Sequence, residues 1–135
     1  VPDPKGEVQR MTRAAEFVPA TQSELARSLA DNAAGPRRRV CPVGGRTALH
    51  YGFSGPPADE IVDLHELALV VDYPARDMTV TVEAGIRVAE LTRLLAAEGQ
   101  QLPIDIAQPE RATLGGAVAT NTHGPRRFGD QHRIP

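Results

Sequence analysis

The chain has 135 residues, of which 41% are hydrophobic and 24% are charged, a composition typical of one soluble globular domain. Its formal net charge of −2 gives no general attraction to nucleic acid or to an anionic membrane. The single cysteine excludes an internal disulfide, and no apolar run reaches the roughly 18 residues that predict a transmembrane helix. Together with the lack of a signal-peptide pattern, these features predict a cytoplasmic location.

The first element that the sequence predicts is a helix that begins at Thr21. Thr21 and Glu24 form a capping-box pattern, and apolar residues then recur at helical spacing until Gly35 and Pro36 end the pattern. A strand is predicted at residues 40–43, and a second short strand or turn at residues 61–64. The residues before the helix carry only weak patterning and predict no element.

The second half of the chain predicts a hairpin followed by a helix. Residues 67–72 form a continuous apolar run, residues 78–84 alternate apolar with polar side chains, and a turn at residues 74–77 joins the two strands. A helix is predicted at Val88–Glu98, where Gly99 ends it. This order of elements predicts an α+β fold, because the regular strand–helix alternation of a doubly wound parallel sheet is missing.

Two glycine-rich segments carry the candidate binding chemistry. The first, Val43–Leu49, follows a strand, and Gly44 and Gly45 would let successive backbone N–H groups converge on one anion such as a pyrophosphate. Arg46 is a candidate for adding positive charge there. A plain β-turn explains this segment equally well when it is taken alone, and its spacing fits neither a P-loop nor the Rossmann fingerprint.

The second glycine-rich segment, Ala112–Gly129, is built mainly of small residues and is predicted to be a loop. Small residues let a flat ligand or another backbone approach closely, and the polar groups of residues 113 and 120–122 can bond to a ligand edge. Glycine and threonine alternate here with few large apolar side chains. This favours a flat heteroaromatic ligand over the alternative, a tight packing turn.

The titratable residues predict no further chemistry. The histidines at positions 50, 65, 123 and 132 do not have the spacing of a zinc site, and Cys41 in an apolar strand is expected to be an inert thiol. No pair of carboxylates predicts acid–base catalysis. We therefore assign no metal site and no catalytic residue.

Three segments of the chain occur together in one superfamily. They read PVGGRTALHYG, VVDYPARDMTVTVEAGIRVAELTRLLAAEGQQLP and ATLGGAVATNTHGPRRFG. In this order they resemble the FAD-binding domain of the vanillyl-alcohol oxidase / p-cresol methylhydroxylase (PCMH-type) superfamily, most closely the FAD-binding subunit of glycolate oxidase. The resemblance, which runs from about Val18 to Gly129, implies two small α+β subdomains that cradle FAD. It also implies that residues 1–135 are a PCMH-type domain truncated at its C-terminal side, without the substrate domain.

The resemblance implies that both glycine-rich segments contact FAD. The first would hold the pyrophosphate mainly through backbone N–H groups, and the second would line the path of the flavin and ribityl part. Some members attach the flavin covalently to a histidine in the first segment, and the threonine at that place here implies non-covalent FAD. The implied cofactor-binding residues are Gly44, Gly45, Arg46, Thr47, Ala48, Leu49, Pro109, Thr113, Leu114, Gly115, Gly116, Thr120, Asn121 and Gly124.

The activity that the resemblance implies is the FAD-dependent oxidation of a small-molecule 2-hydroxy acid of the glycolate or D-lactate type. The alternatives are a sugar or alditol oxidase of the same superfamily, and a non-catalytic module that keeps the fold without flavin. The intact glycine pairs argue against the last alternative. The resemblance further implies other oxidase subunits, including an iron–sulfur protein, and through them a place at the inner face of the membrane. For the 135 residues alone we expect weak FAD binding or none, and no activity.

Overall fold

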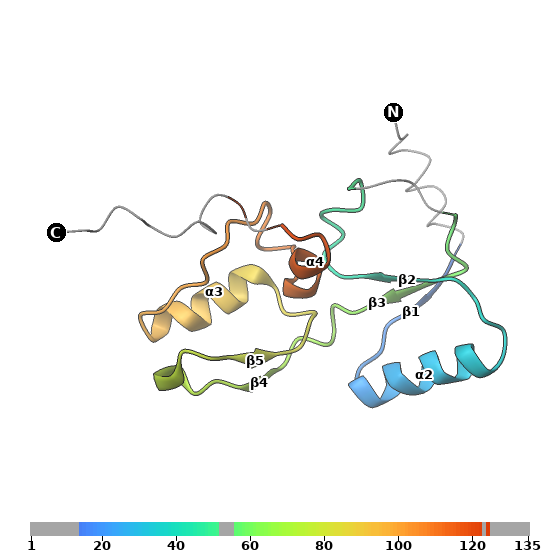
Figure 1. Cartoon of the computed structure of the whole chain (residues 1–135), viewed down its shortest axis with the longest axis horizontal. Coiled ribbons are helices and arrows are strands. Elements are labelled where there is room, and N and C mark those ends of the chain that lie inside the picture. Colours follow the sequence, from blue (N-terminus) through green and yellow to red (C-terminus); the bar gives the residue numbers. More distant parts are fainter. Residues whose placement is uncertain (1–13, 52–55, 123, 125–135) are drawn as a thin grey trace.

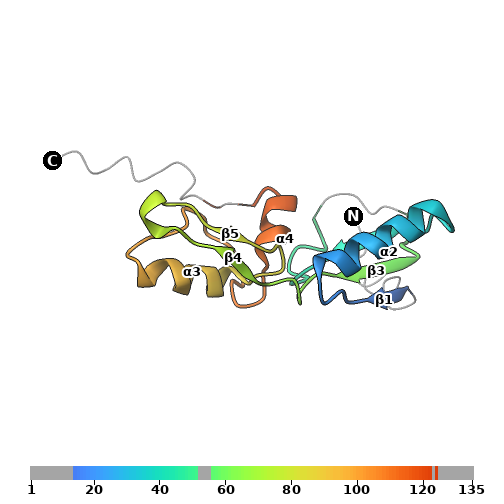
Figure 2. The ribbon, with the colours of Figure 1, turned by 90° about the horizontal axis from the view of Figure 1, so that it is seen from below.

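The structure, a computed structural model, describes residues 14–51, 56–122 and 124. Figure 1 shows two lobes side by side along the long axis, and Figure 2 shows the same division after a quarter turn. The first lobe contains β1, α2, β2 and β3, the second contains β4, β5 and α3, and α4 lies at the junction of the lobes. The elements are β1 (Ala15–Phe17), α2 (Gln22–Ala34), β2 (Val40–Val43), β3 (Glu60–Asp63), β4 (Val70–Asp72), η1 (Ala75–Asp77, a 3₁₀ turn), β5 (Thr81–Val82), α3 (Val88–Ala97) and α4 (Leu114–Ala119).

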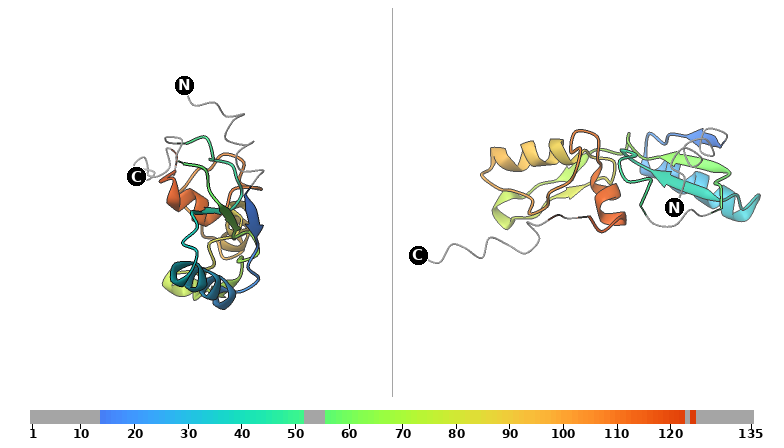
Figure 3. Two further views of the ribbon diagram at one scale, coloured as in Figure 1. Left: turned by 90° about the vertical axis from the view of Figure 1, so that its right-hand side faces the viewer. Right: turned by 90° about the horizontal axis from the view of Figure 1, so that it is seen from above.

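The first lobe is a three-stranded sheet in the order β1-β3-β2, and both strand pairs are parallel. Ile61 and Val62 of the central strand are almost fully buried, and α2 covers one face of the sheet (Figures 2 and 3). The register pairs Val43 with Asp63, so β2 and β3 end at the same edge. The first glycine-rich segment therefore leaves the sheet at the carboxyl ends of two parallel strands, where ligands of such sheets usually bind.

The helix α2 begins as its sequence predicts. Thr21 is the N-cap residue, and its hydroxyl accepts a hydrogen bond of 3.1 Å from the N–H of Glu24. The Glu24 carboxylate reaches back one residue further than in a standard capping box, to the N–H of Ala20 at 2.8 Å. The helix ends at Ala34, directly before the predicted stop.

The second lobe is the predicted hairpin with α3 packed on one face. β4 and β5 pair antiparallel, and Ile86, Leu91 and Leu95 form the core beneath them. The hairpin is confirmed, but its paired strands are shorter than the apolar patterns, partly because η1 occupies the connection. Since α3 covers only one face, Leu69 and Val71 on the outer side are 69% and 60% exposed.

Two elements were not predicted correctly. β1 is missing from the prediction because three residues, two of them exposed, are too short to show a strand period. The segment predicted to be a loop instead contains α4, although glycine disfavours helix by about 1 kcal/mol per residue relative to alanine. Tertiary contacts outweigh this cost, as shown below. Residues 123 and 125–129 of the same segment lie outside the described residues. Within the described ranges, no helix is both long and apolar enough to cross a membrane.

Candidate functional site

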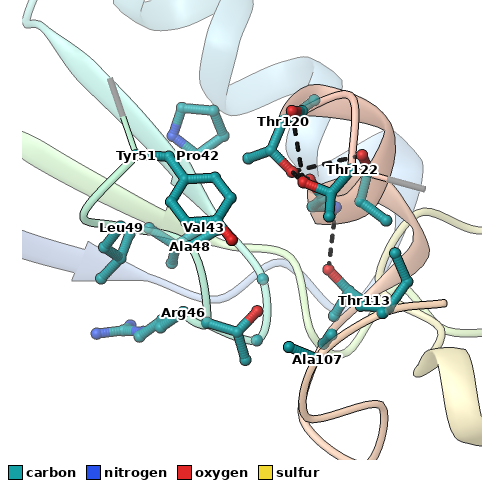
Figure 4. A pocket seen from close by; sticks show the side chains of 18 residues that line it. Pro42, Val43, Arg46, Ala48, Leu49, Tyr51, Ala107, Thr113, Thr120 and Thr122 are labelled. Carbon is teal, nitrogen blue, oxygen red and sulfur yellow. Dashed lines mark hydrogen bonds between the residues drawn. The ribbon is translucent and has the colours of Figure 1, made fainter. Parts of the chain in front are cut away.

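A cavity of about 150 Å³ lies between the loop that follows β2 and the helix α4 (Figure 4). It brings together residues from both glycine-rich segments, which are more than sixty positions apart in sequence. The predicted residues that line it are Gly44, Gly45, Arg46, Thr47, Ala48, Leu49, Thr113, Gly116 and Thr120, together with the hydroxyl-bearing Thr122. Four further residues of the two glycine-rich segments also line it, namely Val43, Ala112, Ala117 and Ala119. Pro42, Tyr51, Ile106 and Ala107, which the sequence did not single out, complete the lining.

The loop after β2, whose residues line the cavity, contains a row of backbone N–H groups that have no acceptor among the described residues. Within the described part of the chain, no group accepts a hydrogen bond from the N–H groups of residues 45–49. These residues are all half-buried. Backbone N–H groups in such positions take up water or a ligand, and several in succession form a concave site for an anion. A plain β-turn would close on itself, and among the described residues of this loop the one turn bond runs from Tyr51 N–H to the Ala48 carbonyl at 3.0 Å.

The N-terminus of α4, in contrast, has no donors left for a ligand. The N–H groups of Leu114 and Gly115 bond to carbonyls of the second lobe at 2.9 and 2.8 Å, and the N–H of Gly116 bonds to the Thr113 hydroxyl at 3.2 Å. These bonds hold the glycine-containing helix in place. Facing the cavity, α4 and the residues after it present the hydroxyls of Thr120 and Thr122, whose oxygens lie 2.8 Å apart (Figure 4).

Three glycines of the predicted site pack against the chain itself. A Cβ at Gly45 would overlap the carbonyl oxygen of Arg111, and its carbonyl carbon would be only 2.6 Å away. A Cβ at Gly44 would overlap the Thr113 hydroxyl, and one at Gly115 would lie 2.8 Å from the Cβ of Ala84. These glycines therefore let the first loop, the second segment and the hairpin approach one another. At Gly115 this is the tight packing that the sequence left as an alternative for the second segment.

The remaining predicted residues lie outside the cavity. Leu114 packs against the core of the second lobe, and the carbonyl of Pro109 accepts a 3.0 Å hydrogen bond from the N–H of Ala89 at the start of α3. Asn121 and Gly124 follow α4, with φ angles of 52° and 64°. None of these residues is in the lining of the cavity.

Arg46 lines the cavity, but its guanidinium is turned away from the threonine hydroxyls on the opposite wall (Figure 4). Its Nη2 donates to Glu16 at 2.7 Å and to Asp63 at 2.9 Å. The hydrogen bond to Asp63 raises the pKa of the guanidinium. Arg46 also has a φ of 55°, a conformation that costs a non-glycine residue about 1 kcal/mol. The guanidinium thus bonds to two carboxylates. Its positive charge, which the sequence analysis proposed for the pyrophosphate, is compensated within the chain.

Asp63 connects Arg46 to a histidine at the end of β3. Its Oδ1 accepts from the backbone N–H of His65 at 3.1 Å and lies 2.8 Å from the Nδ1 of the same residue. Burial alone would raise the pKa of Asp63, but the hydrogen bonds from His65 and Arg46 outweigh it and lower that pKa. The bond to Asp63 raises the pKa of His65.

This pair predicts a defined dependence of stability on pH. Because the pKa of His65 is raised in the folded protein, its contribution is complete below pH 6.5, its ordinary value, and is lost as the pH rises through the raised pKa. We expect the free energy of unfolding, measured by urea denaturation, to fall as the pH rises above 6.5. The variant His65→Gln should show a smaller fall, and an equal fall in both proteins would contradict this assignment.

The cavity offers hydroxyl groups and backbone donors but no acid–base pair. Among the described residues that line it, none is a histidine, an aspartate or a glutamate. In the described ranges of the chain, no group of three or more His, Cys, Asp or Glu side chains could hold a metal ion. The site as described can bind and orient an anionic, partly flat ligand, and its lining supplies no group that would abstract a proton.

Comparisons with known proteins show the family to which the chain belongs. The model of the FAD binding domain family matches residues 14–132. D-2-hydroxyglutarate dehydrogenase of Xanthomonas citri pv. viticola is 33% identical over 93 residues, which cover 67% of this chain and 20% of that protein. Alditol oxidase of a Streptomyces species is 33% identical over 106 residues, which cover 78% of this chain and 24% of that protein.

A solved structure shares the fold. The structure of an alkyldihydroxyacetonephosphate synthase superposes with a TM-score of 0.65 at 26% identity, over 81% of this chain and 22% of that one. The chain thus spans about a fifth of the length of the proteins it matches. The α+β fold and the FAD cofactor that the resemblance implied are confirmed. The chain belongs to the FAD binding domain family, and the curated proteins that it resembles include a dehydrogenase and an oxidase.

Proposed function

We propose that this chain forms the pyrophosphate-binding part of the FAD site in an oxidoreductase that oxidises a 2-hydroxy acid. The observation that carries the proposal is the row of free N–H groups at residues 45–49, because several free donors in succession at the end of a parallel strand can hold one anion. Bound FAD would accept a hydride from the substrate. The chain's own residues would hold and orient the cofactor.

The lining of the cavity fits this role. It contains no carboxylate among the described residues, so nothing there repels a diphosphate. Small side chains of α4 leave room for a flat group, and the paired hydroxyls of Thr120 and Thr122 can bond to a polar edge. A volume of about 150 Å³ accommodates only a part of FAD, which supports weak binding by these residues. Thr47, at the place of the histidine used for covalent attachment in some relatives, supports non-covalent binding.

The proposed substrate class rests on the relatives. The D-2-hydroxyglutarate dehydrogenases that match the chain act, by their names, on a 2-hydroxy acid. Glycolate and D-lactate are smaller members of the same class and stay the specific substrates that we propose. The match to alditol oxidase favours a polyol as the second candidate. Further oxidase subunits, an iron–sulfur protein among them, and a place at the inner face of the membrane stay predictions from the resemblance.

Titration of the chain with FAD, followed by the fluorescence anisotropy of the flavin, tests the proposal. Of the two outcomes that the sequence leaves open, weak binding or none, the cavity favours weak binding, and we expect a dissociation constant on the order of 0.1 mM or weaker. The variant Gly116→Leu should reduce the affinity at least about tenfold, because Gly116 lines the cavity and its Cβ would meet only the Thr113 hydroxyl, at 3.2 Å.

The matched control is Val118→Ala on the outer side of the same helix. Val118 is 74% exposed and does not line the cavity, so its truncation should leave FAD affinity unchanged. The proposed site is wrong if millimolar FAD produces no anisotropy change. It is also wrong if the Gly116→Leu variant binds FAD as tightly as the unaltered chain and the Val118→Ala control.

A further inference from the structure

The free N–H groups of the loop after β2 depend on the backbone conformation at Arg46. Arg46 lies within the row of donors and has a φ of 55°, in the left-handed region that favours glycine. A turn to negative φ at this residue would redirect the neighbouring N–H groups. An arginine at such a position needs a compensating interaction, and its side chain supplies one.

That interaction ties the loop to all three strands of the first lobe. The loop continues from β2, and the Arg46 guanidinium reaches Asp63 at the end of β3 and Glu16 on β1, at 2.9 and 2.7 Å. The side chain of Asp63 is only 9% exposed. It is also held by the backbone and the ring of His65, so it is a fixed acceptor.

The charges around Arg46 do not favour a direct role in binding an anion. Besides the guanidinium, the described cluster contains the carboxylates of Glu16 and Asp63, the imidazole of His65, and the carboxylate of Glu66 at 2.9 Å from that ring. The described cluster contains three carboxylates and only one arginine. The Nη2 of that arginine is hydrogen-bonded to two of the carboxylates. The guanidinium is turned away from the threonine hydroxyls on the opposite wall of the cavity (Figure 4), and its charge is compensated by Glu16 and Asp63.

We propose that Arg46 is a positioning residue, whose ion pairs with Asp63 and Glu16 hold the loop in the conformation that aims its N–H groups at the pyrophosphate. The guanidinium itself does not touch the cofactor. This inference rests on the proposed function, and it deepens that function by naming what keeps the anion site in shape.

Three variants separate positioning from charge when FAD affinity is titrated as above. Arg46→Ala loses the ion pairs and keeps the strained backbone, so affinity should fall about tenfold. Arg46→Gly loses the same charge but adopts positive φ without strain, and should stay within about threefold of the unaltered chain. Asp63→Asn removes a negative charge near the anion site, yet should weaken FAD binding about tenfold because the anchor of Arg46 is lost.

The control is Arg39→Ala. Arg39 forms an ion pair with Asp59 at 2.9 Å elsewhere in the first lobe, outside the cavity lining, and its loss should leave FAD affinity unchanged. The inference is overturned if Arg46→Ala binds as tightly as the unaltered chain, if the glycine variant is as weak as the alanine variant, or if Asp63→Asn binds FAD more tightly. A failure of the proposed function looks different, because the unaltered chain would then not bind FAD at all.

Discussion

Replacing Gly45 by alanine is expected to destabilise the protein by about 3 kcal/mol and to abolish measurable FAD binding. The added methyl group would overlap the carbonyl oxygen of Arg111 and lie 3.0 Å from the Cα of Ala112. Both partners are backbone atoms, which cannot turn aside as the end of a side chain can. The two glycine-rich segments would have to separate, and the cavity between them would open. Urea denaturation followed by circular dichroism measures the loss of stability.

Gly116→Ala is the matched control for Gly45→Ala. Gly116 lies inside α4, where alanine is the better helix former, and its Cβ would meet only the Thr113 hydroxyl at 3.2 Å. Its free energy of unfolding should change by less than about 1 kcal/mol. If Gly45→Ala lost FAD binding while keeping its full stability, Gly45 would face the cofactor, as the sequence alone suggests, and the packing role described above would be wrong.

Replacing Leu91 by alanine is expected to cost about 3 kcal/mol in the free energy of unfolding. Leu91 is 1% exposed and packs with Ile86 and Leu95 beneath the hairpin. The same helix positions the cavity wall, because the N–H of Val88 at its start donates to the carbonyl of Ala112 at 2.9 Å. The loss of this core contact should therefore also weaken FAD binding.

Leu69→Ala provides the comparison for Leu91→Ala with the same chemical change. Leu69 is 69% exposed on the outer side of the hairpin, so the same truncation should cost less than about 0.5 kcal/mol. Denaturation midpoints of the two variants give the difference directly. Equal losses would mean that the apolar core does not lie between α3 and the hairpin.

The local parts of the fold could be predicted from the sequence. Thr21 with its capping pattern marks the start of α2, and the apolar stripe with Gly99 marks α3, because both signals involve neighbouring residues only. The first glycine-rich segment was correctly placed after a strand. Its free donors agree with the predicted anion site, and their contact with FAD stays a prediction.

The parts that escaped prediction depend on contacts between distant residues. α4 forms because its first N–H groups bond to the second lobe, with Gly115 donating to the carbonyl of Ala84, and no local pattern announces such a bond. The pairing of Arg46 with Glu16 is equally hidden, since thirty positions separate them in the sequence. The sequence therefore suggested that Arg46 binds the ligand, whereas in the structure its side chain bonds to carboxylates on two strands of the sheet.

The backbone amide resonances of residues 45–49 give the most direct test of the central claim, that these N–H groups hold the pyrophosphate of FAD. The 135-residue chain is small enough for amide correlation spectra during titrations with FAD and, separately, with riboflavin, which has the same flavin ring but no phosphate. We expect the signals of residues 45–49 to shift with FAD and to stay in place with riboflavin at the same concentration. Unchanged signals of these residues with FAD, or equal shifts with both ligands, would contradict the claim.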